Sequence, residues 1–181
     1  MTNHAAFRLF TLWAHLSLLA VGPTAWAQPD SEPAPAVLLK QIEHLSELLR
    51  DPYASWYQEA TMVQQVAVPG GSPLALAVFT VEGFGGGNNH SQYFAVFSPE
   101  EGMDGTVHYT LLDVLPVAGK GWRGVWELNA RVSRAHDAYA TDIHLDALAV
   151  GEDDAPNFPS VPVTLHLRLK DGRLDDLTSQ R

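Results

Sequence analysis

The chain has 181 residues, no cysteine, and 21 acidic residues against 11 Lys and Arg, which gives a formal net charge of −10 at pH 7. The lack of cysteine excludes disulfides, thiolate metal sites and a cysteine nucleophile. The acidic balance disfavours nucleic acid and anionic lipid as partners, because binding to either depends on clustered Lys and Arg, and it would attract cationic partners.

The first 27 residues have the pattern of a cleaved export signal. A short segment with Arg8 and no acid precedes an apolar run over 9–22, and Ala25 and Ala27 flank Trp26 in a small-x-small cleavage site. The apolar run is shorter than the ~20 residues that a membrane helix needs. We therefore expect cleavage after Ala27 and export to the periplasm or the medium, with no membrane insertion of the cleaved protein.

Cleavage would leave 181 less 27, or 154 residues, a length that suits one domain with a single core. Arg8 is the only charge removed, so 10 Lys and Arg would face 21 acids, a charge of −11. Residues 28–35 are rich in proline and polar residues. We expect a signal peptide at 1–27, a flexible leader at 28–35 and a single α+β domain at 36–181.

Helical periodicity begins at Ala36. The apolar residues recur at intervals of three and four, at Val37, Leu38, Ile42, Leu45, Leu48 and Leu49. Asp51 and Pro52 then either end the helix or start another, because Asp is a good N-cap and Pro suits the first helical position. One interpretation is therefore a second short helix over 52–59.

Three aromatic residues, Tyr53, Trp56 and Tyr57, follow the first helix. Aromatic rings dominate the energetics of ordinary cores. We interpret these three as rings that seal the helical segment onto a sheet, in preference to a ligand platform.

After residue 60, strand-like runs separated by turn residues replace the helical period. The expected strands cover 61–68, 73–81, 90–97, 106–117, 122–133, 141–150 and 161–170, and 174–177 is a candidate for a short last strand. The run at 73–81 is almost continuously apolar, which is typical of a strand buried on both faces.

The connections between these strands are short and no second helix-rich region supplies crossovers. The sequence therefore predicts an α+β fold, with an N-terminal helix packed on an antiparallel, mostly meander sheet of about seven strands. A closed or half-closed barrel, with the helix on one face or plugging an end, is the alternative.

Alternation over 122–133 places Trp122 and Trp126 on one face, with Val125 as the exception. We predict that both tryptophans belong to the core. Lys120, just before this run, and Arg123, within it, either lie exposed on a turn without a binding role or act as binding anchors.

In a meander, every second loop lies at the same end of the sheet. This parity places the loops 83–89, 118–121 and 151–160 together, which combines a glycine-rich loop, two cations and an acidic loop. Binding residues concentrate on loops carried by a rigid scaffold. The predicted binding residues are Gly85, Gly86, Gly87, Asn88, Asn89, Lys120 and Arg123.

The glycine-rich loop lacks the features of a nucleotide site. A P-loop requires Lys and Ser or Thr directly after its last glycine and a helix behind them, whereas Asn88 follows here and the next segment predicts a strand. The histidines lack H-x-x-x-H or H-E-x-x-H spacing, and 151–160 lacks the spacing of a calcium loop. We expect no cofactor and no metal.

Catalytic motifs are also missing. The chain has no G-x-S-x-G elbow and no S-x-x-K motif. A small hydrolase or lyase would have to use separated polar groups such as Glu82, His90 and Asp113, and Glu82 is equally suited to capping loop amides.

Two segments resemble a group of small, exported, functionally uncharacterised proteobacterial proteins. They are A-V-F-T-V-E-G-F-G-G-G-N-N-H-S-Q-Y-F-A-V-F and L-L-D-V-L-P-V-A-G-K-G-W-R, within residues 74–125. Members of that group with a cysteine-rich C-terminal segment differ from this chain, which has no cysteine. The resemblance implies no mechanism, but it adds weight to the two glycine motifs as a pair.

Together these features predict an exported, non-catalytic binding or interaction domain whose partner is a protein or a small molecule, with a cationic partner favoured by charge. An inhibitor or immunity protein against envelope-targeted toxins or lysozymes is one concrete version. The alternatives are a small envelope hydrolase or lyase, and a structural or stress-related envelope protein.

Overall fold

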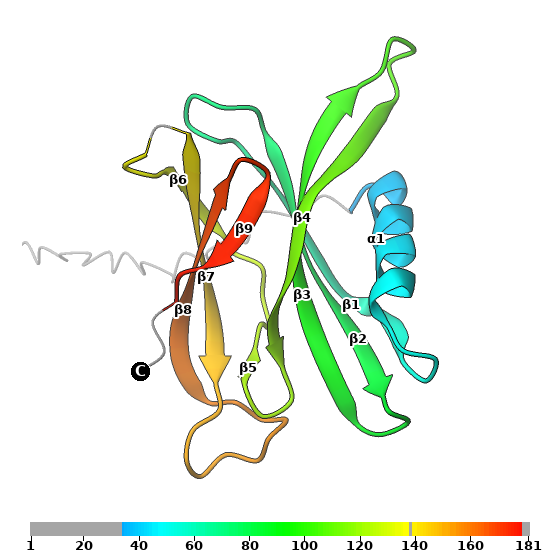
Figure 1. The fold of residues 1–181 in the computed structure, drawn as a ribbon, viewed down its shortest axis with the longest axis vertical. Coiled ribbons are helices and arrows are strands. Elements are labelled where there is room, and N and C mark those ends of the chain that lie inside the picture. The colour runs from blue at the N-terminus through cyan, green and yellow to red at the C-terminus, as the bar shows by residue number, and fades with distance from the viewer. Residues whose placement is uncertain (1–33, 138, 179–181) are drawn as a thin grey trace, which may run out of the picture. The chain divides into compact units, whose positions relative to one another are not determined.

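A computed structural model describes residues 34–137 and 139–178 (Figure 1). The predicted signal peptide, with its cleavage site, and most of the predicted leader lie outside the described residues. In the described part of the chain, no helix has both the length and the apolar character needed to cross a membrane.

The described elements are one helix and nine strands. In chain order they are α1 (Ala36–Leu49), β1 (Ser55–Val66), β2 (Leu74–Phe84), β3 (Asn89–Glu101), β4 (Val107–Gly119), β5 (Arg123–Gly124), β6 (Arg131–Arg134), β7 (Ala140–Ala149), β8 (Val161–Lys170) and β9 (Arg173–Asp176). The sheet order is β1-β2-β3-β4-β5-β7-β8-β9, with β6 paired to β7, and every pair is antiparallel. The predicted helix on an antiparallel meander is confirmed, and the estimate of about seven strands was too low.

Of the two strands beyond seven, one is the candidate last strand, which forms β9. The other arises because the run predicted at 122–133 is not one strand. Its two ends, β5 and β6, pair with the same strand, β7, at Leu148–Ala149 and at Thr141–His144 respectively. Between them, residues 125–130 leave the sheet.

The second short helix predicted at 52–59 is wrong, because residues from Ser55 onward form β1. The Asp51 side chain, instead of capping a helix, accepts the backbone N–H groups of Tyr53 and Ala54 at 2.9 and 2.8 Å and closes a turn. Such side-chain turns compete with helix formation at Asp.

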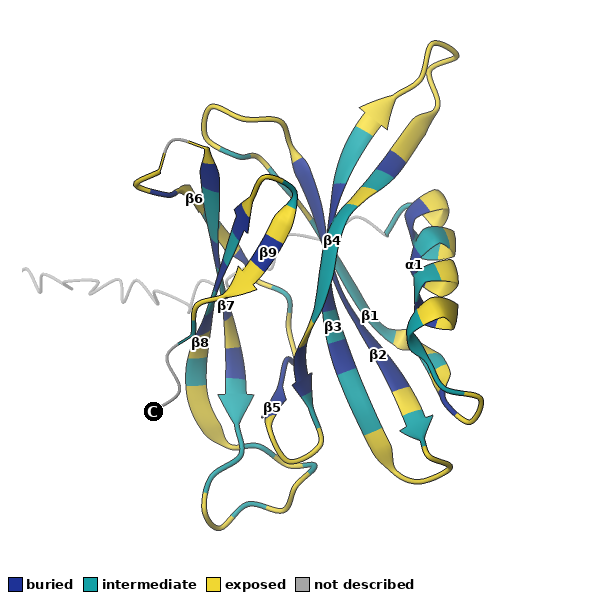
Figure 2. Cartoon of the chain, in the orientation of Figure 1, coloured by how far each residue is buried: buried dark blue, intermediate teal, exposed yellow. Residues whose placement is uncertain are grey.

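Helix α1 packs on the sheet through a stripe of residues spaced by four, namely Leu38, Ile42 and Ser46. The helix contacts β1 and β4, and its buried residues share one core cluster with Ala75 and Ala77 of β2. It ends where Pro52 disfavours helical backbone at the preceding residue. Figure 2 shows the resulting contrast between the buried face of α1 and its exposed outer face.

Strand β2 is buried on both faces over its first eight residues, as its continuous apolar run predicted. Side chains alternate across a strand, so its odd-numbered residues face α1 and its even-numbered ones face β7, β8 and β9. A second core therefore fills the other side of the sheet; its buried members include Leu76, Val78, Phe94, Ile143, Leu145, Leu165 and Leu167.

The sheet bends so that β9 approaches β4 and β5. Arg123 Nη1 on β5 lies 2.9 Å from Asp176 Oδ2 on β9, and the Leu174 N–H donates to Asp113 Oδ2 on β4 at 2.8 Å. Within the described residues β1 pairs only with β2 and β9 only with β8, so the sheet is open. The closed barrel is therefore wrong for this part of the chain.

Two glutamines hold the segment that leaves the sheet. The Gln92 side chain on β3 accepts the Val125 N–H at 2.7 Å and donates to the Val125 carbonyl at 2.9 Å. Gln64 on β1 does the same for Ala130, at 2.7 and 3.1 Å. Each primary amide thus replaces the peptide group of a neighbouring strand, which satisfies backbone groups that would otherwise be unpaired.

We predict that Gln92→Leu lowers the free energy of unfolding by about 2–4 kcal/mol, because two buried backbone groups of Val125 lose their partner. Urea denaturation would measure the change. The exposed Gln65 on β1 gives a matched control, and Gln65→Leu should stay within about 0.5 kcal/mol of the wild type. Equal effects of the two substitutions would contradict the role given to Gln92.

Candidate functional site

The three loops that parity placed together do meet at one end of the sheet, at the bottom of Figure 1. The Gly121 N–H donates to the Pro156 carbonyl at 2.7 Å, which joins the loops 118–121 and 151–160. The Lys120 N–H donates to the His90 carbonyl at 3.3 Å, and the Lys120 ammonium donates to Asn88 Oδ1. The loop 118–121 therefore contacts both of the others.

A cavity of about 340 Å³ lies between the sheet and these loops. Its lining combines aromatic rings, carboxylates and amides: Tyr57, Trp126, Glu59, Glu82, Gln92 and Asn157. A second cavity of about 490 Å³ includes Gly83, Gly87 and Asn88, and it shares Glu82, His90 and Asn157 with the first. Both volumes lie in the range of about 300–1,000 Å³ that small-molecule sites occupy.

Strand register explains why these side chains share one face. Glu82 on β2 is paired with Ser55 on β1 and with His90 on β3, and the next row towards the sheet centre joins Tyr57, Thr80 and Gln92. Directly opposed residues of antiparallel strands project from the same face. Glu82 and His90 of the first row line both cavities, and the row of Tyr57, Thr80 and Gln92 lines the first cavity alone.

Burial lowers the pKa of the His90 imidazole, and the nearby Lys120 ammonium acts in the same direction, while the Glu82 carboxylate opposes both. The net shift is downward, so His90 is uncharged at neutral pH. A neutral imidazole next to Glu82 offers the cavity one donor and one acceptor.

The amides of the glycine-rich loop are already hydrogen-bonded within the protein. The Gly85 N–H donates to Asp51 Oδ2 at 2.8 Å, Gly86 to the Gly83 carbonyl at 2.9 Å and Gly87 to the Phe84 carbonyl at 3.3 Å. Gly83 has φ 93°, and a Cβ there would lie 3.2 Å from the Tyr53 carbonyl oxygen. The glycines therefore serve a tight turn and a close backbone approach.

The predicted binding residues take different places around the cavities. Gly87 and Asn88 line the second cavity, while Gly85, Gly86, Asn89 and Lys120 lie beside the cavities without lining them. Their role in binding stays a prediction.

Arg123 lines the first cavity, but its charge is already paired. The side chain is 7% exposed, bonds to Asp176 and stacks on the Trp122 ring at 4.6 Å. Burial alone would raise the pKa of Asp176, but hydrogen bonds from Thr178 and Arg123 hold it below its ordinary value. Arg123 therefore acts first as an internal ion-pair partner between β5 and β9.

The tryptophans were predicted to be core, and this is wrong. Trp126 is 66% exposed and Trp122 39% exposed, whereas Val125 is 1% exposed. Because residues 125–130 leave the sheet at Val125, this residue points inward and Trp126 points outward. The break in alternation at Val125 was the sequence signal for this arrangement.

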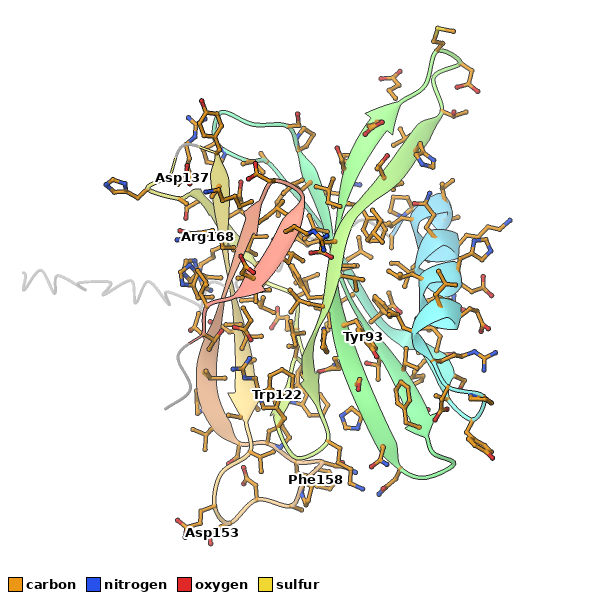
Figure 3. All side chains as sticks on the ribbon, viewed as in Figure 1. Tyr93, Trp122, Asp137, Asp153, Phe158 and Arg168 are labelled. Carbon is orange, nitrogen blue, oxygen red and sulfur yellow. The ribbon has the colours of Figure 1, made fainter. Side chains whose placement is uncertain are left out.

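The prediction that Tyr53, Trp56 and Tyr57 all seal the helix is wrong for two of the three. Trp56 packs in the core beneath α1, but Tyr53 is 72% exposed and Tyr57 44% exposed. Tyr57 lines the first cavity and Tyr53 the second. The exposed Phe158, labelled in Figure 3, adds another ring at this end of the molecule.

The structure does not assemble the three polar groups named for a hydrolase. Glu82 and His90 adjoin, but Asp113 lines neither cavity and accepts the N–H groups of Val114 and Leu174. Across residues 34–137 and 139–178, no group of three or more His, Asp and Glu is arranged to hold a metal ion.

The acidic loop uses one of its carboxylates to fix its own shape. Asp154 accepts the N–H groups of Gly151 and Ser160 at 2.7 and 2.9 Å and the Ser160 hydroxyl at 2.9 Å. Asp153 projects away from the fold (Figure 3). The loop thus covers the cavity mainly through Pro156, Asn157 and Pro159.

Asn157 carries an unsatisfied polar atom. Its side-chain oxygen is buried and, among the described residues, has no hydrogen-bond partner. Buried polar atoms without partners are rare in folded proteins. This acceptor lies on one of the three residues that line both cavities.

No family model, curated protein or solved structure matches this chain. The candidate site therefore rests on its geometry.

We predict that Gly119→Ala lowers the free energy of unfolding by about 1–3 kcal/mol, because its Cβ would lie 2.8 Å from the His90 carbonyl oxygen and force β3 and β4 apart. Thermal or urea unfolding would measure this. Gly87→Ala is the control, since its Cβ would meet no atom closer than 3.9 Å. An unchanged free energy of unfolding for Gly119→Ala would contradict this prediction and would mean that the two strands separate freely at the site.

We predict that Asp51→Asn lowers stability at neutral pH and that the difference from wild type shrinks as the pH falls. The Gly85 N–H, above all, holds the pKa of Asp51 below its ordinary value. A lowered folded-state pKa stabilises the protein above the unfolded-state pKa, and this contribution is lost as the pH falls through the folded-state value.

Urea midpoints at about pH 7 and about pH 3 would measure this dependence. Asp153→Asn is the matched control, because it removes the same formal charge without removing a hydrogen bond that the described residues show. A difference between Asp51→Asn and wild type that is constant with pH would contradict the role given to the Asp51 carboxylate.

Proposed function

We propose that the protein is an exported, non-catalytic binding domain that holds a small molecule or a side chain of a partner protein in the cavity at its loop end. The observation that carries this proposal is the cavity of about 340 Å³ with Tyr57 and Trp126 in its lining, both exposed to solvent. A concave site with exposed aromatic rings and a few polar groups is the usual form of a ligand site.

The surroundings of the cavity support a binding role. Trp122, Tyr53 and Phe158 place further exposed rings at the same end of the molecule. Exposed apolar side chains that gather in one region mark interaction sites, and tryptophan and tyrosine are enriched among residues that dominate binding energy. These rings do not pack in the core, and a binding role accounts for their exposure.

Export supplies the cellular setting of the proposal. The N-terminal 27 residues have the pattern of a cleaved signal, which supports export to the periplasm or the medium. An inhibitor or immunity protein, which inserts its loop end into an envelope-targeted toxin or lysozyme, is the concrete version that we favour among protein partners.

The alternatives receive less support from the same geometry. Of the three groups named for a hydrolase or lyase, only Glu82 and His90 lie at the cavity, because Asp113 is bonded elsewhere. A purely structural envelope protein would have no use for a cavity lined by exposed aromatic rings.

We predict that the double variant Tyr57→Ala/Trp126→Ala loses its ligand, with retention reduced at least about tenfold. The immobilised protein would be incubated with envelope extract of its source cells, and bound material would be identified by mass spectrometry. Tyr139→Ala is the control, because Tyr139 is also exposed but precedes β7 at the opposite end of the sheet. Identical material on all three proteins, or none on the wild type, would refute the proposal.

A further inference from the structure

We propose that the group bound in the cavity is an organic cation, an alkylammonium or a guanidinium, held between the Tyr57 and Trp126 rings and the carboxylates of Glu59 and Glu82. This inference rests on the proposed function and names the chemistry of its ligand. It follows from three features of the cavity, namely its rings, its uncompensated charges and its unsatisfied acceptor, and from the occupied amides of the adjacent glycine-rich loop.

The rings are placed to receive a cation. Tyr57 comes from β1 and Trp126 from the segment that Gln92 holds against β3, and both line the cavity. The Trp126 ring lies against Gly124, where a Cβ would be 3.2 Å from the indole Nε1 and 2.9 Å from Pro159 Cγ. The faces of tryptophan and tyrosine attract ammonium and guanidinium groups.

The charges that remain available at the cavity are negative. Glu59 and Glu82 are exposed and line the cavity, and their carboxylates make no hydrogen bond or ion pair among the described residues. The cation of the lining, Arg123, is neutralised by Asp176 at 2.9 Å. Lys120 is outside the lining, where its ammonium bonds to Asn88.

An anionic ligand fits the site poorly. The amides of Gly85, Gly86 and Gly87, which would otherwise form an anion-binding loop, are bonded to Asp51, Gly83 and Phe84. His90 adds no positive charge at neutral pH, because burial holds its pKa below the ordinary value.

The unsatisfied acceptor favours a ligand that donates. Asn157 lines the cavity, and its buried side-chain oxygen has no donor among the described residues. A ligand reaches this oxygen only after the Asn157 side chain rotates it toward the cavity. Ammonium and guanidinium groups carry only donors, so either would then supply the missing hydrogen bond.

The test measures binding of n-butylguanidinium and n-butylammonium by isothermal titration and by tryptophan fluorescence, with n-butylurea as the neutral analogue of similar shape. We expect saturable binding of the cations that is at least about tenfold tighter than that of n-butylurea. Equal binding of the neutral analogue would overturn the inference.

Variants locate the site of binding. Glu82→Gln should weaken n-butylguanidinium about three- to tenfold and Trp126→Ala by a similar factor. Glu152→Gln, which removes an acid from the same end but outside the cavity, should leave the affinity unchanged. Equal weakening by Glu82→Gln and Glu152→Gln would show that the overall negative charge attracts the cation, which overturns the inference.

Two sources of the cation are separated by competition. A peptide rich in Lys and Arg that displaces n-butylguanidinium would indicate a partner protein that inserts a side chain, and failure to displace it would indicate a free small cation. If the variant Tyr57→Ala/Trp126→Ala loses its envelope ligand while neither butyl cation binds the wild type, the cation inference fails and the binding function stands.

Discussion

Two side-chain amides hold residues 125–130 against the face of β1–β3 that lies opposite α1. Gln92 and Gln64 reach from β3 and β1 and bind the backbone of Val125 and Ala130 as a neighbouring strand would. Without them this segment would carry unpaired backbone groups into a partly buried space, which is costly. The same segment connects β5 and β6, which both pair with β7. The glutamines therefore attach the first part of the sheet to the second, where β4 is joined to β5 by a single pair of residues, Gly119 and Arg123.

The candidate site is a consequence of this attachment. Because the chain leaves the sheet at Val125, the space between β1–β3 and the departing segment is not filled by a strand, and a cavity remains there. The departure also reverses the direction of the side chains, so that Val125 enters the core and the Trp126 ring forms a wall of the cavity. The departure of the chain from the sheet at Val125 thus creates the cavity and also places one of its aromatic rings.

Much of the fold could be predicted from local patterns. The helix followed from three- and four-residue periodicity, the burial of β2 from its continuous apolar run, and the meeting of three loops from the parity of a meander. The residues of the site were harder to predict. Sequence reasoning selected glycines, asparagines and two cations, and of these only Arg123 lines the first cavity. The aromatic rings, carboxylates and amides of that lining, such as Trp126, Glu59 and Gln92, were not selected. Trp126 was assigned to the core because alternation was extended through Val125, although the exception at that residue was visible.

The sequence by itself determined the features that depend on neighbouring residues: one helix, antiparallel strands with short connections, and the end at which every second loop lies. Only the tertiary structure decided which backbone groups glutamine side chains would pair, where the strand predicted at 122–133 breaks, and whether Arg123 is free. Gln92 acts over 33 residues, Gln64 over 66 and the Arg123–Asp176 pair over 53. No local periodicity encodes contacts over such separations, because they form only when the bent sheet brings β1, β3 and β9 to the segment that begins with β5.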